Sequence, residues 1–87
     1  MPQPHDIKIT VTSALAGHPY QHDYAPQVTA ASVLSDTLTA FGFVSDGTTR
    51  YYLFFDGHEV PPEATVDELA GHARALHLKL RTETTNG

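Results

Sequence analysis

The chain has 87 residues, 40% of them hydrophobic and 17% charged, with a formal net charge of -5 and no cysteine. This length supports a single hydrophobic core, and the lack of cysteine excludes disulfides, thiolate nucleophiles and cysteine-based zinc sites. No apolar run approaches the roughly 20 residues of a membrane helix, and the opening MPQPHD does not resemble a secretion signal, so we expect a cytoplasmic protein without membrane contact. Only five Lys and Arg residues are present, which argues against nucleic acid as a partner.

The first half of the chain predicts a hairpin followed by a helix. Residues 6–13 alternate apolar and polar side chains, as a half-buried strand does. A turn at Gly17 leads into the polar and aromatic residues 18–28, where two prolines confine any strand to a sheet edge or a short middle section. Residues 30–41 repeat apolar side chains at helical spacing, with Thr29 placed to cap the helix start and Gly42 placed to end it.

The second half predicts two further strands and a helical turn. Residues 51–55 (YYLFF) are apolar and aromatic throughout, and an Asp-Gly turn then leads into a short run at residues 58–60. Residues 65–69 form a capped single turn before the alternating leucines of the last strand, at residues 76–80. This order predicts an α+β fold: a mixed sheet of four or five strands packed on one helix, with the first and last strands side by side beneath it.

Two stretches give the chain a family resemblance. LFFDGHEV at residues 53–60 and ATVDELAGHARALHLKLR at residues 64–81 resemble, in order and spacing, the corresponding segments of ubiquitin and its β-grasp relatives. The resemblance covers roughly residues 6–81. It implies one ubiquitin-like β-grasp domain over residues 1–81, ordered from about residue 6, followed by a flexible tail at residues 82–87.

The resemblance also implies a function for the tail. A ubiquitin-like modifier is activated at its C-terminal glycine, here Gly87, by an E1-like enzyme, passed to an E2-like carrier, joined to an amine of a target protein and removed by a deconjugating protease. Those partners would recognise the tail residues: Arg81, Thr82, Glu83, Thr84, Thr85 and Asn86. The single glycine after Asn86 departs from the glycine pair of ubiquitin, so the partner enzymes would need their own specificity. The modifier itself would be no enzyme and would need no cofactor.

The proline-rich, alanine-rich and lysine-poor composition favours a bacterial modifier, of the kind encoded with its own conjugation enzymes in antiphage systems. Two alternatives of the same fold stay open. One is an interaction module that is not conjugated, like small ubiquitin-like components of bacterial secretion systems. The other is a sulfur carrier, which the missing glycine pair disfavours.

Four positions match the hydrophobic recognition patch of ubiquitin: Leu15, Phe54, His77 and Lys79. Lys79 stands where ubiquitin has a valine, so ordinary exposure of the sheet competes with a protein-binding role. If Tyr52 rather than Phe54 points outward, the patch shifts with the register of the strand.

Other polar residues favour simpler interpretations. His18 and His22 have the spacing of metal ligands on a helix, but Pro19 opposes a helix there, so solvated edge histidines are the better interpretation. Asp67 and Glu68 are expected to charge the first turn of a short helix rather than to act as catalytic carboxylates.

Overall fold

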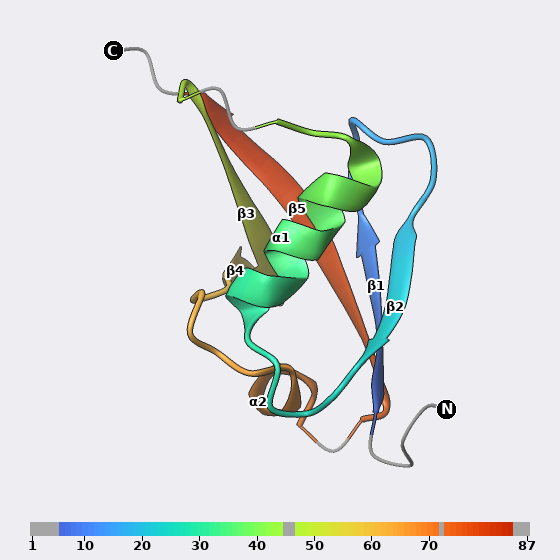
Figure 1. The fold of residues 1–87 in the computed structure, drawn as a ribbon. Coiled ribbons are helices and arrows are strands. Elements are labelled where there is room, and N and C mark those ends of the chain that lie inside the picture. Colours follow the sequence, from blue (N-terminus) through green and yellow to red (C-terminus); the bar gives the residue numbers. More distant parts are fainter. Residues whose placement is uncertain (1–5, 45–46, 72, 85–87) are drawn as a thin grey trace.

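The computed structural model describes residues 6–44, 47–71 and 73–84 and contains one five-stranded sheet in the order β2-β1-β5-β3-β4. Helix α1 crosses one face of this sheet, and the short helix α2 lies at one end (Figure 1). The elements are β1 (Ile7–Thr12), β2 (Tyr20–Tyr24), α1 (Ala30–Phe41), β3 (Thr49–Phe55), β4 (His58–Glu59), α2 (Val66–Ala70) and β5 (Ala75–Thr84). The predicted α+β architecture is confirmed.

The first and last strands are neighbours, as predicted. β1 and β5 run parallel with Ile9 opposite Leu76 and Val11 opposite Leu78, while β1 and β2 form an antiparallel hairpin. A parallel pair needs a long crossover, which α1 and the strands between β1 and β5 supply. Ile9, Val11 and Leu78 are at most 1% exposed, so this central pair forms the floor of the core beneath α1.

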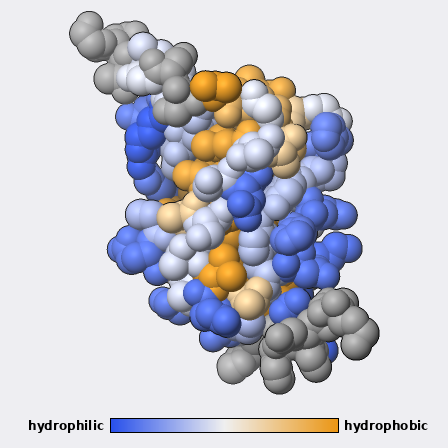
Figure 2. All heavy atoms as spheres, viewed as in Figure 1, coloured by the Kyte–Doolittle hydropathy of each residue, from blue (hydrophilic) through white to orange (hydrophobic). Residues whose placement is uncertain are grey.

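The ends of α1 agree with the sequence signals. The Thr29 hydroxyl accepts a hydrogen bond from the Ser32 backbone N–H, and Gly42 adopts the left-handed conformation with φ of 75°. The Phe43 N–H then donates to the Leu38 carbonyl at 2.9 Å, which satisfies one of the free carbonyls at the helix end. In Figure 2, apolar side chains show between α1 and the sheet, with hydrophilic residues on both sides of this band.

Helix α2 begins with the predicted cap. The Thr65 side chain accepts from the Glu68 backbone N–H, and the Glu68 carboxylate accepts from Thr65 in return. Asp67 and Glu68 therefore lie in the first turn, where the helix dipole favours acidic side chains. Neither α1 nor α2 has the length and apolar character of a membrane-crossing helix in the part of the chain that the structure describes.

Strand β5 extends further than the sequence indicated. We expected the domain to end at Arg81, but β5 continues to Thr84, and β3 begins at Thr49 instead of Tyr51. The two strands pair antiparallel up to Thr49 opposite Thr84. β1 pairs with β5 as far as Lys79, so among the described residues the last part of β5 pairs with β3 alone. We call this two-stranded extension, Thr49–Tyr52 with Arg81–Thr84, the β3–β5 ribbon.

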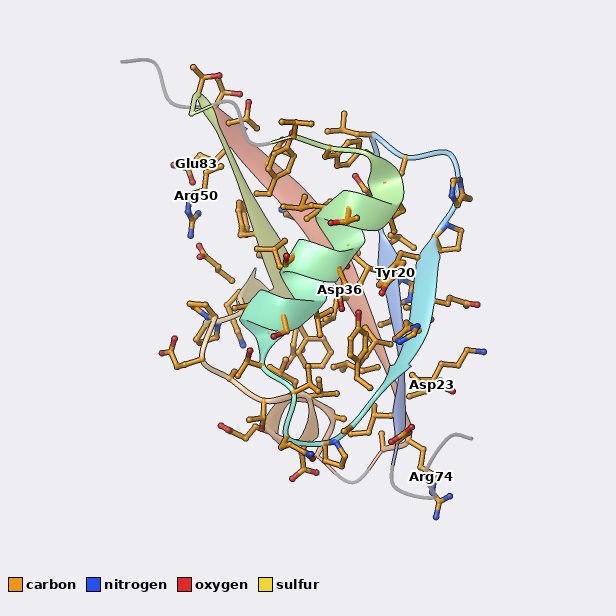
Figure 3. The ribbon with its side chains drawn as sticks, viewed as in Figure 1. Tyr20, Asp23, Asp36, Arg50, Arg74 and Glu83 are labelled. Atoms are coloured by element: carbon orange, nitrogen blue, oxygen red, sulfur yellow. The ribbon has the colours of Figure 1, made fainter. Side chains whose placement is uncertain are left out.

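The first three residues of the expected tail, residues 82–84, therefore lie in a strand and not in a flexible segment. β5 includes Thr82, Glu83 and Thr84, because β3 extends beside them and its backbone groups form hydrogen bonds with theirs. Arg50 and Glu83, opposite each other in register, lie side by side at the end of the ribbon (Figure 3) and approach to 3.6 Å. Thr85, Asn86 and Gly87 lie outside the described residues.

Candidate protein-binding site

The face of the sheet opposite α1, here called the outer face, carries most of the residues that the sequence singled out. Side chains alternate between the two faces of a strand, and Leu53, Leu78 and Leu80 are buried on the α1 side. Their neighbours therefore point outward. Tyr52 and Phe54 are two residues apart in β3 and so share the outer face. The sequence presents them as alternatives for the outward-pointing residue, but both point outward.

Three of the four predicted patch residues come together on the outer face. Phe54 is opposite Lys79 in the β3–β5 register. With His77, they line a shallow hollow of about 260 Å³ beside the turn at Asp56 and Gly57. The distance from Nε2 of His77 to the hydroxyl oxygen of Thr12 in the neighbouring strand β1 is 3.1 Å. This contact holds the imidazole against the sheet at one wall of the hollow.

Leu15 does not join this group by any hydrogen bond or ring contact among the described residues. It lies in the turn after β1, where it is 64% exposed and its backbone N–H donates to the Ser13 hydroxyl at 3.1 Å. Among the described residues, Leu15 does not line the hollow that Phe54, His77 and Lys79 share.

The group on the outer face is cationic and aromatic rather than apolar. The guanidinium carbon of Arg81 lies 4.0 Å from the centroid of the Phe54 ring, and that of Arg50 lies 4.9 Å from the centroid of Tyr52. A guanidinium over a ring face is attracted by the negative charge of the π-system. The stacked Arg81 therefore covers one face of the Phe54 ring.

The two arginines differ in how their charges are balanced. Arg50 forms an ion pair with Glu59 of β4, and its second contact is Glu83. The hydrogen bond with Glu59 is the main cause that raises the pKa of Arg50. Neither Lys79 nor Arg81 has an ion-pair partner within the described ranges. No carboxylate among the described residues therefore forms an ion pair with Lys79 or Arg81.

Sequence reasoning missed the role of Arg81 in this surface. Arg81 was expected to begin the tail that partner enzymes recognise, whereas it lies within β5 and stacks on Phe54. The pattern Phe54–Lys79–Arg81 could have been found only with the strand register, because the stacked pair sits on diagonal positions of two strands that are far apart in sequence.

A second cluster lies on the α1 side, between β2 and α1. The Tyr24 hydroxyl donates to Oδ2 of Asp36 at 2.9 Å and lies 2.7 Å from the Tyr20 hydroxyl. Figure 3 shows Asp36 of α1 directed toward Tyr20 of β2. Burial of Tyr24 and its hydrogen bonds raise the pKa of its phenol well above the ordinary value. These polar groups connect the edge strand to the helix.

The two histidines of the first hairpin pack against aromatic rings. His22 lies edge-on to Tyr24 with ring centroids 4.9 Å apart, and His18 lies edge-on to Phe41 at 6.1 Å. The described residues include no group of three or more His, Cys, Asp or Glu side chains arranged to hold a metal ion. His22 faces the α1 side of β2 together with Tyr24, while its neighbour Asp23 points to the other side.

Comparison with known proteins finds solved structures with the same architecture but no match by sequence. No protein-family profile and no curated protein matches the sequence. The ubiquitin of Caldiarchaeum subterraneum superposes with a TM-score of 0.73 and 25% identity, covering 94% of this chain and 99% of that one. The C-terminal ubiquitin-like domain of the human 2'-5'-oligoadenylate synthetase-like protein gives 0.71 and 14% identity over 100% of this chain and 94% of that one.

A structure described as molecular mimicry of SUMO that promotes DNA repair is similar at a TM-score of 0.71, with 13% identity over 91% of this chain and 94% of that one. At identities this low the likeness shows the fold alone, whereas the archaeal ubiquitin also shares a quarter of the residues. A fold shared with ubiquitin agrees with the prediction that the chain is not itself an enzyme and acts with protein partners. The chain therefore has the ubiquitin-like β-grasp fold.

Proposed function

We propose that this chain is a protein modifier that is conjugated through Gly87. The observation that carries the proposal is the end-to-end likeness to an archaeal ubiquitin, which is covered over 99% of its length. Further support comes from the sequence, in which Gly87 follows the last residue of β5, Thr84, by three positions. Glycine suits such a reactive end because it has no side chain to obstruct attack at its carbonyl.

The chemistry divides between the modifier and its partners. An E1-like enzyme joins the Gly87 carboxylate to the α-phosphate of ATP with release of pyrophosphate, and a cysteine thiolate of the enzyme then displaces AMP to form a thioester. After transfer to an E2-like carrier, an amine of the target attacks the thioester carbonyl and releases the carrier thiol. A deconjugating protease hydrolyses the resulting amide.

The paired end of β5 sets a geometric condition on this route. The Cα of Gly87 can lie at most about 11 Å from that of Thr84, since an extended chain spans up to about 3.6 Å per residue. An active site that needs the roughly 20 Å reach of all six residues from Thr82 onward must separate Thr82–Thr84 from β3. All three residues are exposed and only β3 pairs with them, so this separation leaves the core intact.

The test uses the full chain, ATP and an activating enzyme from the same source. Wild-type protein is expected to give an adenylate and then a thioester that reducing agents cleave. Deletion of Gly87 should abolish both products, whereas Glu63→Ala, a change at an exposed residue outside the tail, should retain both. Unchanged adenylate and thioester after deletion of Gly87 would disprove the proposal.

The setting of this modifier is part of the proposal. The chain has only two lysines, Lys8 and Lys79, and its alanine- and proline-rich composition favours a bacterial source. We assign it to an antiphage conjugation system. Deletion of Gly87 in the native host should then remove both the high-molecular-weight adducts of the protein and protection against phage. Protection that persists without adducts would contradict this assignment.

A second candidate is an interaction module that is never conjugated. The outer face favours it, because Phe54, His77 and Lys79 line one hollow there. In this case Phe54→Ala should abolish capture of a partner, while removal of residues 85–87 should have no effect. Loss of capture after that removal would exclude the module.

A further inference from the structure

The outer face combines unneutralised positive charge with aromatic rings over a small area. We call the residues concerned the cation–aromatic patch: Tyr52, Phe54, His77, Lys79 and Arg81. The first two belong to β3 and the last three to β5, where His77, Lys79 and Arg81 alternate with buried leucines and are all exposed. The whole chain has a net charge of -5, so the patch is opposite in sign to the protein as a whole.

The contrast with Arg50 shows where a ligand would be attracted. Arg50 lies on the same face, but Glu59 and Glu83 already balance its charge. Lys79 and Arg81 have no such carboxylates among the described residues, and Arg81 is held in place by stacking on Phe54 at 4.0 Å. A preorganised cation without a carboxylate partner is a site where an incoming carboxylate forms new charge-assisted hydrogen bonds.

The spacing of the two cations defines the shape of the ligand. Lys79 and Arg81 are two residues apart on one strand, so their α-carbons are about 6.8 Å apart and their side chains leave the same face. Alternate residues of any extended segment have the same spacing. Carboxylates at positions i and i+2 of an extended peptide can therefore meet both cations at once.

We propose that the cation–aromatic patch binds an acidic, extended segment of a partner protein, with two carboxylates two residues apart on Lys79 and Arg81. The match of charge and spacing selects this class of partner. An apolar helix of the kind that contacts a hydrophobic sheet face would leave both cations unpaired and is disfavoured. The interaction goes beyond conjugation and does not depend on it, because Gly87 does not belong to the cation–aromatic patch.

The test starts from an unbiased probe. A random linear peptide library is selected on the full-length protein, and the enriched peptides are expected to carry Asp or Glu at i and i+2. The best peptide is then titrated into isotopically labelled protein, and the amide signals of Tyr52, Phe54, Lys79 and Arg81 should shift. Its affinity should fall as salt is added, because exposed charges are screened.

Matched variants separate this patch from general positive charge. Replacing both Lys79 and Arg81 by serine should weaken the peptide at least about tenfold, since hydrogen bonds between charged groups are lost. Arg50→Ser removes a single cation from the same face, and Arg81→Ser is its matched counterpart. Arg50→Ser should alter affinity less than about twofold, because Glu59 and Glu83 already balance the charge of Arg50. Lys79→Arg should retain binding. Thermal unfolding of each variant shows that the fold is kept.

Three results would overturn the proposal. Enrichment of peptides without paired acids would remove the predicted ligand class. Equal loss of affinity in Arg50→Ser and the double serine variant would show that only overall charge matters. A single-stranded DNA oligonucleotide that shifts the same amides at lower concentration than the peptide would assign the patch to nucleic acid. Failure of Gly87-dependent conjugation, by contrast, would leave these binding results unchanged.

Discussion

Replacing Tyr24 by phenylalanine tests how the edge strand β2 is fixed to α1. Tyr24 is 6% exposed, and its hydroxyl donates to Asp36 at 2.9 Å while lying 2.7 Å from the Tyr20 hydroxyl. The substitution keeps the ring and removes only the hydroxyl. Hydrogen bonds to charged groups contribute roughly 1.5–3 kcal/mol. Because the Asp36 residue is exposed and water can replace the lost donor, we expect a loss nearer about 1 kcal/mol in the free energy of unfolding.

The size of this loss is measurable in a protein of 87 residues. With an unfolding entropy of about 2.1 cal/mol/K per residue, 1 kcal/mol lowers the melting temperature by about 5 °C. Circular dichroism and urea titration give the free energy of unfolding for Tyr24→Phe, Asp36→Asn and the double variant. The two single changes should not add, because both act on the same hydrogen bond: Tyr24→Phe removes its donor, and Asp36→Asn removes the charge of its acceptor. Tyr51→Phe, in which a half-buried ring stacked on Phe43 also loses its hydroxyl, is the control and should change stability little.

Two outcomes would refute this reasoning. Additive effects of Tyr24→Phe and Asp36→Asn within about 0.3 kcal/mol would show that the hydroxyl and the carboxylate do not interact in solution. An equal loss in Tyr51→Phe would show that any tyrosine hydroxyl has the same effect.

The pH dependence of stability gives a further check on the same residue. Burial raises the pKa of Tyr24 in the folded state above its unfolded value. The resulting stabilisation is fully present below the unfolded pKa of about 10 and is lost as the pH rises through the folded pKa. The wild type should therefore lose stability relative to Tyr24→Phe above about pH 10. A difference between the two proteins that stays constant in that range would contradict the burial of the phenol.

Two other predictions concern the core and the helix end. Leu78→Ala, at a side chain only 1% exposed, should lower the free energy of unfolding by about 2–5 kcal/mol in urea titration; a loss below about 1 kcal/mol would mean that the β1–β5 floor is loosely packed. Gly42→Ala should cost about 1–2 kcal/mol, because Gly42 has φ of 75°. Gly17→Ala, at a glycine without positive φ and with open space around it, should change stability by less than about 0.5 kcal/mol, and equal losses at the two positions would contradict the left-handed cap.

The sequence predicted most residues of the candidate site, but it did not predict how their side chains contact one another. Phe54, His77 and Lys79 were identified from the resemblance, and the structure places them around one hollow. That Arg81 covers the Phe54 ring could not be predicted, because the contact joins diagonal positions across two strands. The register that makes them neighbours is set by pairing between residues nearly thirty positions apart. The pattern within one strand fixes which face is buried, but it does not specify which residues of a distant strand lie opposite.

The sequence by itself determined the local structure of this protein. Alternating leucines and isoleucines specify which faces of β1 and β5 are buried, and Thr29, Gly42 and Thr65 specify where helices begin or end, because caps and periodicity act over only a few residues. Only the tertiary structure decided that β5 runs on to Thr84 and that Arg81 on its outer face is stacked on Phe54. Both features depend on β3 as a distant neighbour, which supplies hydrogen-bond partners to one end of β5 and aromatic rings to its cations.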